Sequence, residues 1–328
     1  MSTHEKYMQR CLAIARNGLG RVAPNPMVGA VLAYGSSVLS EGYHRGYGLP
    51  HAEVEAIGKV RRKDLLPDCT LYVSLEPCCH VGKTPPCTEL IIASKIPRVV
   101  VATADPFPKV NGSGIQRLRE AGVEVTVGVL ERQAREQNRR FFTFYEKKRP
   151  YIILKWAQSA DGFMDACRTA SEPPEKISGA PAHRLSHKWR TEEQAIMVGA
   201  NTALMDNPRL TARLWCGQNP TRVVYDENSQ LPRTLNLFSN EAPTLSLASG
   251  SISRWMPELY QRSIQSLMVE GGAKLLQRFI AAGLWDEARI FTSPRKLLQG
   301  VAAPRVGGAV RREERIGSDL LQLLTPTA

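Results

Sequence analysis

The sequence lacks any long apolar run. Although 43% of its 328 residues are hydrophobic, no segment approaches the about 18 consecutive apolar residues that a membrane-spanning helix needs. The first residues, 1–6, also lack the apolar stretch of a secretory signal peptide. These absences argue against a membrane-spanning or secreted protein, and we expect the chain to be cytoplasmic.

Internal repeats, low-complexity segments and a disulfide scaffold are also missing. The seven cysteines are odd in number, and four of them fall between residues 69 and 87. In a reducing compartment such a cluster favours metal binding over disulfide bonds. The other three cysteines are isolated, and we interpret them as packing residues or inert surface thiols.

Acidic side chains are fewer than basic ones, 31 against 43, which gives a formal net charge of +12. An excess of this size favours an anionic partner such as nucleic acid, an anionic membrane or a phosphorylated small molecule. It is distributed over both halves of the chain. Its densest run, residues 132–148, also contains four aromatic residues. We interpret this run as an amphipathic helix leading into a linker, with a nucleic-acid contact as the alternative.

The length of the chain favours two domains of about 150 residues each. In the first half, helical and strand patterns alternate, which predicts a three-layer α/β sandwich. The expected helices cover residues 5–17, 50–60, 85–94 and 114–121, and the expected strands cover 70–74, 98–103 and 124–127, with a hairpin at 28–39.

A new buried strand begins at Pro150, so we place the domain boundary near residue 148 and expect domains over 1–148 and 149–328. The second domain again alternates between the two patterns. Its expected strands cover residues 150–156, 195–198, 222–226, 266–269 and 287–292, and its expected helices cover 180–191 and 273–282.

Three residues of the first half are spaced as zinc ligands. His51 opens a helical pattern, Cys78 follows a strand, and Cys87 lies just inside the next helix. Catalytic zinc takes three protein ligands and leaves one position for water. The usual signature places the second cysteine three residues after the first, but that position is Val81 here. We therefore assign Cys87 rather than Cys79, which is adjacent to Cys78 and cannot easily share its direction.

A carboxylate accompanies this ligand set. Glu53 follows His51 by two residues at the start of the same helix. It can take a proton from water and pass it to a substrate, as a general acid–base residue does. The combined pattern predicts a zinc-dependent deaminase of the cytidine-deaminase type.

An ordered series of motifs extends over essentially the whole chain. The motifs are PNPMVGAVL (24–32), EGYHRGYGLPHAEVEAI (41–57), LEPCCHVGKTPPCTELI (75–91), DPFPKVNGSGIQRLREAGVEV (105–125), LKWAQSADGFM (154–164), HKWRTEEQAIMVGANTALMDNPRLTAR (187–213) and VEGGAKLLQRFI (269–280). Together they closely resemble the bifunctional deaminase–reductase family of riboflavin biosynthesis. The resemblance implies a cytidine-deaminase-like sandwich followed by a dihydrofolate-reductase-like α/β domain.

The same resemblance implies two consecutive reactions. The first domain would use Zn²⁺ to hydrolyse the ring amino group of 2,5-diamino-6-ribosylamino-4(3H)-pyrimidinone 5′-phosphate. The second would use NADPH to reduce the ribosyl group to a ribityl chain. Because the substrate is a phosphorylated small molecule, we expect no nucleic-acid or membrane partner. We also expect a homo-oligomer.

Positions that match the family's motifs imply further site residues. Around the zinc ligands, the deaminase substrate would contact Asn25, His44, His80, Lys83, Thr84 and Asp105. In the second domain, the substrate would contact Lys155, Arg190, Leu210, Arg213 and Glu270. The nicotinamide cofactor would contact Thr202, Asp206, Gly271 and Gly272, where glycines allow a phosphate to approach backbone N–H groups.

Two positions depart from the family's pattern. Several relatives have asparagine where this chain has Phe107, so any pocket contact from that side chain is absent or replaced. Many relatives have a glycine–glutamate–x–x–tryptophan–isoleucine–threonine run where this chain has residues 171–178 with two prolines. The aromatic residue expected near the cofactor is Lys176 here. We carry no cofactor or substrate role onto residues 171–178.

Two other functions remain as alternatives. The zinc set and the positive charge are also compatible with a nucleic-acid-editing deaminase that carries an added domain. The departure at residues 171–178 is compatible with a deaminase whose reductase domain is degenerate and structural.

Overall fold

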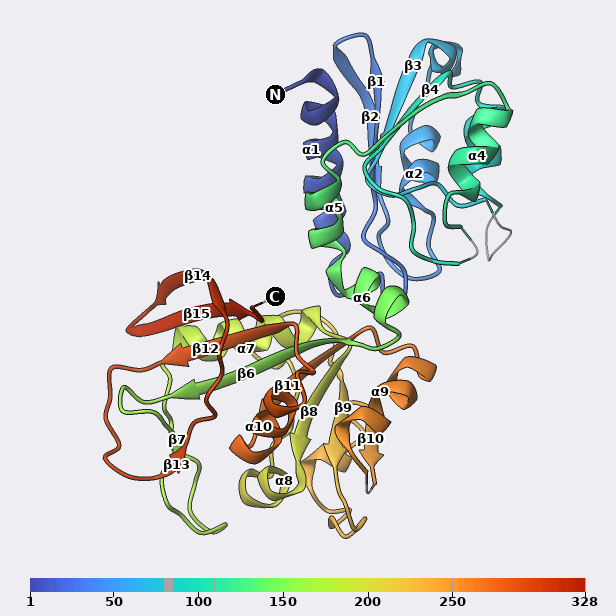
Figure 1. Ribbon diagram of the computed structural model, residues 1–328. Helices are drawn as coiled ribbons and strands as arrows, with labels where there is room; N and C mark the ends of the chain where they lie inside the picture. The colour runs from blue at the N-terminus through green and yellow to red at the C-terminus, as the bar shows by residue number, and fades with distance from the viewer. Residues whose placement is uncertain (80–84, 109, 249, 328) are drawn as a thin grey trace. The chain divides into compact units, whose positions relative to one another are not determined.

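The chain forms two compact units, Met1–Lys147 and Lys148–Ala328 (Figure 1). The computed structural model describes residues 1–79, 85–108, 110–248 and 250–327. In this part of the chain, no helix is both long enough and apolar enough to cross a membrane. Each unit is built on its own β-sheet.

The first unit has a five-stranded sheet with the order β2-β1-β3-β4-β5. Its strands are β1 (Gly29–Tyr34), β2 (Ser37–Tyr43), β3 (Cys69–Val73), β4 (Arg98–Val101) and β5 (Glu124–Val127). Strand β1 is antiparallel to both β2 and β3, whereas β3, β4 and β5 are parallel. The parallel strands end at the same edge of the sheet, where the loop with Cys78 begins.

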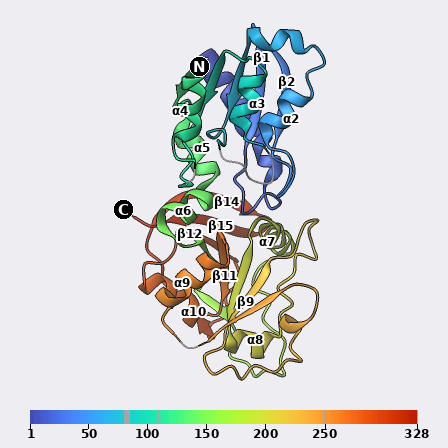
Figure 2. The same ribbon diagram turned by 90° about the vertical axis from the view of Figure 1, so that its right-hand side faces the viewer.

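Helices cover both faces of this sheet (Figures 1 and 2). They are α1 (Thr3–Ala15), α2 (Ala52–Gly58), α3 (Cys87–Ala93), α4 (Ser113–Glu120), α5 (Glu131–Gln137) and α6 (Arg139–Lys147), with short 3-10 helices at Arg16–Gly18 and Lys63–Asp68. Alternate residues of a strand face opposite sides. Leu71 and Val73 therefore pack with α2, α3 and α4, and Tyr72 packs with α1. The predicted three-layer sandwich is confirmed.

The basic, aromatic run at residues 132–148 forms two short helices, α5 and α6, where a single helix was expected. The break falls at Asn138, whose side chain bonds to the backbone of Met27. Phe141 and Phe142 are buried with Leu75 in one hydrophobic cluster. Buried rings cannot stack on bases, so this part of the run supports the packing interpretation.

The second unit has an eight-stranded sheet with the order β10-β9-β8-β11-β6-β12-β15-β14. Its strands are β6 (Tyr151–Gln158), β8 (Ala195–Gly199), β9 (Thr221–Tyr225), β10 (Thr244–Leu247), β11 (Ser266–Gly271), β12 (Glu287–Thr292), β14 (Ala309–Ile316) and β15 (Asp319–Thr325). In this order, the strands from β10 through β9, β8, β11 and β6 to β12 are parallel to one another. Strand β15 is antiparallel to both of its neighbours, β12 and β14. A separate ribbon pairs β7 (Phe163–Asp165) with β13 (Val301–Ala302).

Two pairs of helices cover the two faces of this sheet. They are α7 (Ala180–Glu192), α8 (Ala200–Asp206), α9 (Ile252–Gln261) and α10 (Ala273–Ala281), with a 3-10 helix at Asn236–Phe238. In β6, Ile152 and Leu154 pack toward α9 and α10, and Ile153 packs toward α7 and α8. The second α/β domain is thus present as predicted. Ligands of such folds bind beyond the carboxyl ends of the parallel strands.

Candidate active sites

The first cluster of functional side chains lies where helices α2 and α3 begin. His51 immediately precedes α2, Cys87 is the first residue of α3, and Cys78 lies in the loop after β3. The His51 Nδ1 atom is 3.6 Å from Cys78 Sγ and 3.3 Å from Cys87 Sγ. All three potential ligand atoms lie within 4.8 Å of one another, so one ion can contact them together.

The two thiols of this cluster differ in acidity. The Cys87 thiol and His51 stabilise a thiolate at Cys78 and lower its pKa to about 4, although burial opposes them. The interaction with Cys78 raises the pKa of Cys87. The Cys87 backbone N–H also donates to Cys78 Sγ at 3.4 Å. One imidazole and two sulfur ligands, one of them a thiolate, fit zinc and leave a tetrahedral position for water.

Cys79 lies outside this cluster. Among the described residues, the only group of three metal-binding side chains is that of His51, Cys78 and Cys87. The Cys79 thiol instead forms a hydrogen bond with the Ser113 side chain, and burial raises the pKa of Cys79. The neighbouring cysteines 78 and 79 thus have different surroundings.

Glu53 is buried beside the cluster, with 3% of its surface exposed. Burial and the negative charge at Cys78 raise its pKa to about 7, and His51 opposes this shift. Its carboxyl group contacts the Cys87 thiol. A carboxyl group with a pKa near neutrality can both accept and release a proton under physiological conditions.

Asn25 and His44 lie behind His51. The His44 ring meets the His51 ring edge-on, with centroids 5.4 Å apart. His44 Nδ1 is 3.0 Å from the Pro50 carbonyl oxygen, which can only accept, so Nδ1 carries the proton. His44 Nε2 is then the acceptor for Asn25 Nδ2, at 3.0 Å. Burial lowers the pKa of His44, which favours this neutral form.

Asp105 is the remaining predicted pocket residue that the structure describes. It is buried, and burial raises its pKa to about 7, although the Phe107 N–H donates to its Oδ1 atom at 2.8 Å and opposes the shift. The Phe107 ring packs on Tyr145, with centroids 5.1 Å apart. Three predicted contacts lie outside the described residues: His80, Lys83 and Thr84.

The second cluster lies in the second unit, where Lys155 is inside β6 and Glu270 is near the end of the neighbouring strand β11. Arg190 of α7 forms a bidentate ion pair with Glu270, with distances of 2.9 and 2.7 Å, and also donates to the Thr211 carbonyl at 2.9 Å. Burial opposes ionisation of Glu270, but Arg190 and Lys155 outweigh it and lower its pKa to about 2. Burial lowers the pKa of Lys155, and Glu270 opposes that shift.

Arg213 and Leu210 flank this cluster on the loop after α8. Arg213 is exposed, and the described part of the chain contains no hydrogen bond or ion pair of its side chain. Leu210 is buried in the cluster beneath α7 and has a left-handed backbone, with φ at 53°. The Leu214 N–H donates to His187 Nδ1 at 3.4 Å. This contact fixes the loop next to Arg213, a role that the sequence did not suggest for His187.

The four predicted cofactor residues fall into two groups. Thr202 lies against Gly272, where a Cβ atom would be only 2.9 Å from Thr202 Oγ1. Gly271 has φ at 129° and lies at the end of β11. Asp206 is separate, at the end of α8, where it pairs with Arg168.

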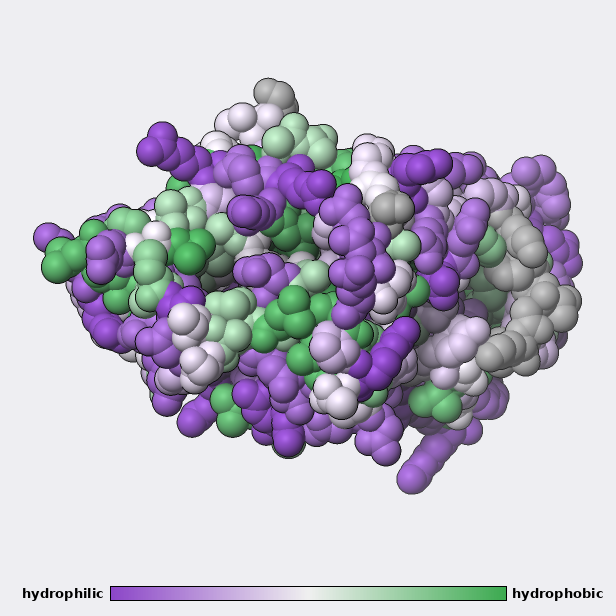
Figure 3. Space-filling view, turned by 90° about the horizontal axis from the view of Figure 1, so that it is seen from below, coloured by the Kyte–Doolittle hydropathy of each residue, from purple (hydrophilic) through white to green (hydrophobic). Residues whose placement is uncertain are grey.

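Figure 3 shows hydrophobic residues near the middle of the face seen from below, bordered by hydrophilic ones.

Comparisons with known proteins agree with this geometry. Residues 1–103 match the cytidine and deoxycytidylate deaminase zinc-binding region, and residues 150–311 match the RibD C-terminal domain. The chain is 38% identical over 326 residues to the riboflavin biosynthesis protein RibD of Aquifex aeolicus (strain VF5), covering 92% of this chain and 90% of that protein. The chain belongs to the RibD family.

Solved structures extend the similarity to RibD proteins. One is a diaminohydroxyphosphoribosylaminopyrimidine deaminase/5-amino-6-(5-phosphoribosylamino)uracil reductase from Thermotoga maritima, with a TM-score of 0.91, 35% identity and 99% coverage of both chains. Another is RibD of Acinetobacter baumannii, with a TM-score of 0.90, 28% identity and 99% coverage of both chains. The predicted family and fold class are confirmed. As a RibD protein, the chain is a bifunctional enzyme of riboflavin biosynthesis that combines a zinc-dependent deaminase with an NADPH-dependent reductase.

One residue of this RibD site was missed from the sequence. Glu76 is buried, and its carboxylate accepts four backbone N–H groups, those of Asp105, Gly112, Gly114 and Ile115, at 2.8 to 3.2 Å. A Cβ atom at Gly114 would lie 2.1 Å from the Pro77 carbonyl oxygen. Glu76 therefore ties the loop before α4 to the segment that carries Cys78. Its backbone partners lie 29 to 39 positions further along the chain, so no local pattern marks this glutamate.

Asn138 is a second residue of this RibD protein that sequence reasoning missed. Its Oδ1 atom accepts the Met27 N–H at 2.8 Å, and its Nδ2 atom donates to the Met27 carbonyl at 2.9 Å. These bonds join the break between α5 and α6 to the loop of Asn25. No sequence signal distinguishes this asparagine from an exposed one in a polar run.

Proposed function

We propose that the first unit deaminates 2,5-diamino-6-ribosylamino-4(3H)-pyrimidinone 5′-phosphate and that the second reduces the ribosyl group of the product with NADPH. The observation that carries the proposal is the cluster of His51, Cys78 and Cys87 beside the buried carboxyl group of Glu53. The deaminase and reductase activities named for the similar Thermotoga maritima protein support the same pair of reactions.

In the deaminase, His51, Cys78 and Cys87 would hold zinc, which supplies activation of the attacking water. Glu53 takes a proton from that water and delivers it to the leaving amino nitrogen. Hydrolysis then replaces the carbon–nitrogen bond with a carbonyl group and releases ammonia. The position of Glu53 beside Cys87 and its pKa of about 7 suit this transfer in both directions.

Asn25 is proposed to bind the pyrimidine edge. Because its Nδ2 atom donates to His44, its Oδ1 atom is left to accept from an amino or ring N–H group of the substrate. His44 holds Asn25 on one side and the Pro50 carbonyl on the other, so it fixes the approach to His51. Asp105, with a pKa of about 7, is proposed to contact the substrate in either its neutral or its charged form. His80, Lys83 and Thr84 are proposed to complete the pocket.

In the reductase, Lys155 and Glu270 are proposed to bind the hydroxyl groups of the ribosyl chain. The ion pair with Arg190 keeps Glu270 charged and in place as a hydrogen-bond acceptor. The exposed guanidinium of Arg213 suits the substrate phosphate. Leu210, with its left-handed backbone, is proposed to shape the same loop on the substrate side. NADPH supplies the hydride. Thr202, Gly271, Gly272 and Asp206 are proposed to contact this cofactor.

The ligands proposed here fit the positive charge of the chain without a nucleic-acid partner. Both reactions use phosphorylated molecules, which a net charge of +12 attracts. We also propose a cytoplasmic location, since a reducing compartment keeps the thiols of Cys78 and Cys87 free to bind a metal.

The proposal is tested by following the mass of the diaminopyrimidine ribosyl phosphate in the presence of zinc-loaded protein. We expect loss of ammonia without NADPH, and a gain of two hydrogens once NADPH is added. Deamination without NADPH oxidation would instead favour a degenerate reductase unit. Absence of both reactions would overturn the assignment of this substrate.

A further inference from the structure

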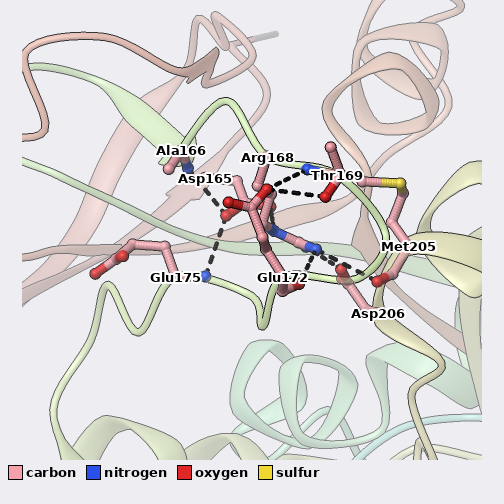
Figure 4. Close-up of polar contacts among 8 residues, drawn as sticks. All are labelled: Asp165, Ala166, Arg168, Thr169, Glu172, Glu175, Met205 and Asp206. Atoms are coloured by element: carbon pink, nitrogen blue, oxygen red, sulfur yellow. Dashed lines mark hydrogen bonds and ion pairs between the residues drawn. The ribbon is translucent and has the colours of Figure 1, made fainter.

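Segment 166–175 of the second unit is closed at its base by one carboxylate. Asp165 lies at the end of β7, and its Oδ1 atom accepts the Ala166 N–H at 2.9 Å and the Glu175 N–H at 3.1 Å. These two residues are the first and last of the segment. Figure 4 shows both N–H groups directed at the Asp165 side chain. The segment therefore begins and ends at the same point.

Arg168 lies inside this segment, with 5% of its side chain exposed. Its Nε atom donates to Asp165 Oδ2 at 2.7 Å. Its Nη1 atom donates to the Glu172 carbonyl at 3.1 Å and to the Met205 carbonyl at 3.3 Å. Its Nη2 atom pairs with Asp206 (Figure 4). One side chain thus satisfies two carboxylates and two carbonyl groups.

These partners belong to two different structural elements. Asp165 and Glu172 are at the base and in the interior of the segment, whereas Met205 and Asp206 end helix α8. The last carbonyl groups of a helix lack partners within it, and a cation there is favourable. Arg168 therefore attaches the segment to the helix that also carries Thr202, beside Gly272.

We propose that Arg168 is a positioning residue of the reductase, which fixes segment 166–175 against α8 and orients Asp206 toward the cofactor. This inference rests on the proposed role of Asp206 in binding NADPH. The resemblance led us to expect an aromatic residue near the cofactor at position 176, whereas Arg168 holds this segment through ion pairs. Lys176, at that position, is exposed, and its carbonyl oxygen accepts from Arg295 Nη1 at 2.7 Å.

Loss of the Arg168 charge has a clear physical consequence. Asp165 and Asp206 would face each other without the cation between them, and the Met205 and Glu172 carbonyls would lose a donor. The two carboxylates are partly buried, so the loss of their shared partner destabilises this arrangement. The segment and the end of α8 would then separate, and Asp206 would lose its fixed orientation.

The test uses the full-length, zinc-loaded protein with Arg168→Met, Arg168→Lys and a matched control, Arg262→Met. Arg262 pairs with Glu258 on the exposed face of α9, at 3.1 Å. NADPH affinity is measured by quenching of tryptophan fluorescence, and amide hydrogen exchange is followed over residues 166–178. Circular dichroism of each full-length variant, compared with the wild type, serves as the check that the second unit is folded.

We expect Arg168→Met to weaken NADPH binding about tenfold or more, as loss of a charged hydrogen-bond network predicts. Amide exchange in the segment should become faster in the same variant. Arg168→Lys, which retains the charge but not the fork of donors, should give an intermediate affinity. If Arg168→Met does not fold, the affinity of Arg168→Lys decides. The control should match the wild type in both measurements.

Wild-type NADPH affinity in Arg168→Met would overturn the inference, whether or not amide exchange becomes faster. Asp206→Asn separates this failure from failure of the proposed function. If Asp206→Asn weakens binding and Arg168→Met does not, only the positioning role is wrong. If Asp206→Asn binds NADPH like the wild type, the proposed cofactor role of Asp206 is wrong and the inference falls with it.

Discussion

At the scale of single residues, the zinc site depends on the surroundings of a few side chains. The sequence allowed Cys87 to be preferred over Cys79, because Cys79 is adjacent to Cys78 and cannot easily share its direction. It did not reveal Glu76, whose four backbone partners come from residues 29 to 39 positions further along the chain. Long-range bonds of this kind leave no local pattern, so a structure is needed to find them.

Replacement of Glu53 by glutamine should separate proton transfer from metal binding. We expect deamination to fall by about 100-fold or more, because the amide cannot act as a general base. Zinc content and NADPH-dependent reduction should stay unchanged. Ammonia release, elemental analysis and NADPH oxidation on deaminated substrate measure these three properties. Deamination at the wild-type rate would remove Glu53 from the mechanism.

Serine substitutions of two cysteines test the ligand assignment. Cys87→Ser should lose zinc, because a hydroxyl group is a much poorer ligand than a thiolate. Cys79→Ser should keep zinc, since the Cys79 thiol bonds to Ser113. Metal content after dialysis is the measurement. The opposite result, with zinc lost only from Cys79→Ser, would show that the assignment is wrong.

The Arg190–Glu270 ion pair predicts a change in the pH dependence of reduction. Arg190 and Lys155 hold the pKa of Glu270 at about 2, so this carboxylate stays charged throughout the usual range of assay pH. In Arg190→Met, the effect of burial is opposed only by Lys155 and, more weakly, His187, so the pKa of Glu270 rises. We expect a new acid limb in the pH–rate profile of reduction, with activity falling as the pH decreases. An unchanged profile in the variant would argue against this coupling.

At the scale of helices and strands, elements with clear periodicity could be predicted and those with mixed patterns could not. The strands around Leu71 and Ile152 are apolar on both faces and were expected. Strand β14 was not, because its charged residues 311–315 show no apolar alternation at the edge of the sheet. Helix α9 contains Pro257, which argues against a helix in a sequence but is tolerated here.

The link between α5 and the loop of Asn25 predicts a local change in stability. Asn138→Ala removes both bonds to Met27 and leaves a buried N–H and a buried carbonyl without partners. We expect the free energy of unfolding of the first unit to decrease by about 1–3 kcal/mol.

The urea midpoints for loss of deamination and of reduction measure this change in each unit separately. The first should decrease and the second should not. Gln116→Ala, which removes only an exposed bond to Glu120, is the control. If the urea midpoints for deamination and for reduction decreased equally in Asn138→Ala, the effect would not be confined to the first unit.

At the scale of the whole molecule, the two activities have separate machinery. The described zinc ligands lie between residues 51 and 87 of the first unit, and the predicted reductase contacts lie between residues 155 and 272 of the second. Length and the motif series were enough to predict this division into two α/β domains. The way in which each cluster is held in place required the structure.

Removal of the metal should therefore affect only one reaction. Dialysis against a chelator is expected to abolish deamination and to leave reduction of already deaminated substrate intact, because none of the proposed reductase contacts is a zinc ligand. Added Zn²⁺ should restore the first activity. Loss of NADPH oxidation in the chelated protein would show that the two units depend on the metal together.

The closure of segment 166–175 by Asp165 also bears on how this protein can evolve. Because both ends of the segment meet at one carboxylate, residues can be inserted or removed between them while β7 and α7 keep their places. The two prolines at 173 and 174 lie within this stretch. Sequence changes in this segment, beside the proposed cofactor contacts, can then leave the sheet unaltered, and a divergent loop need not signal a lost activity.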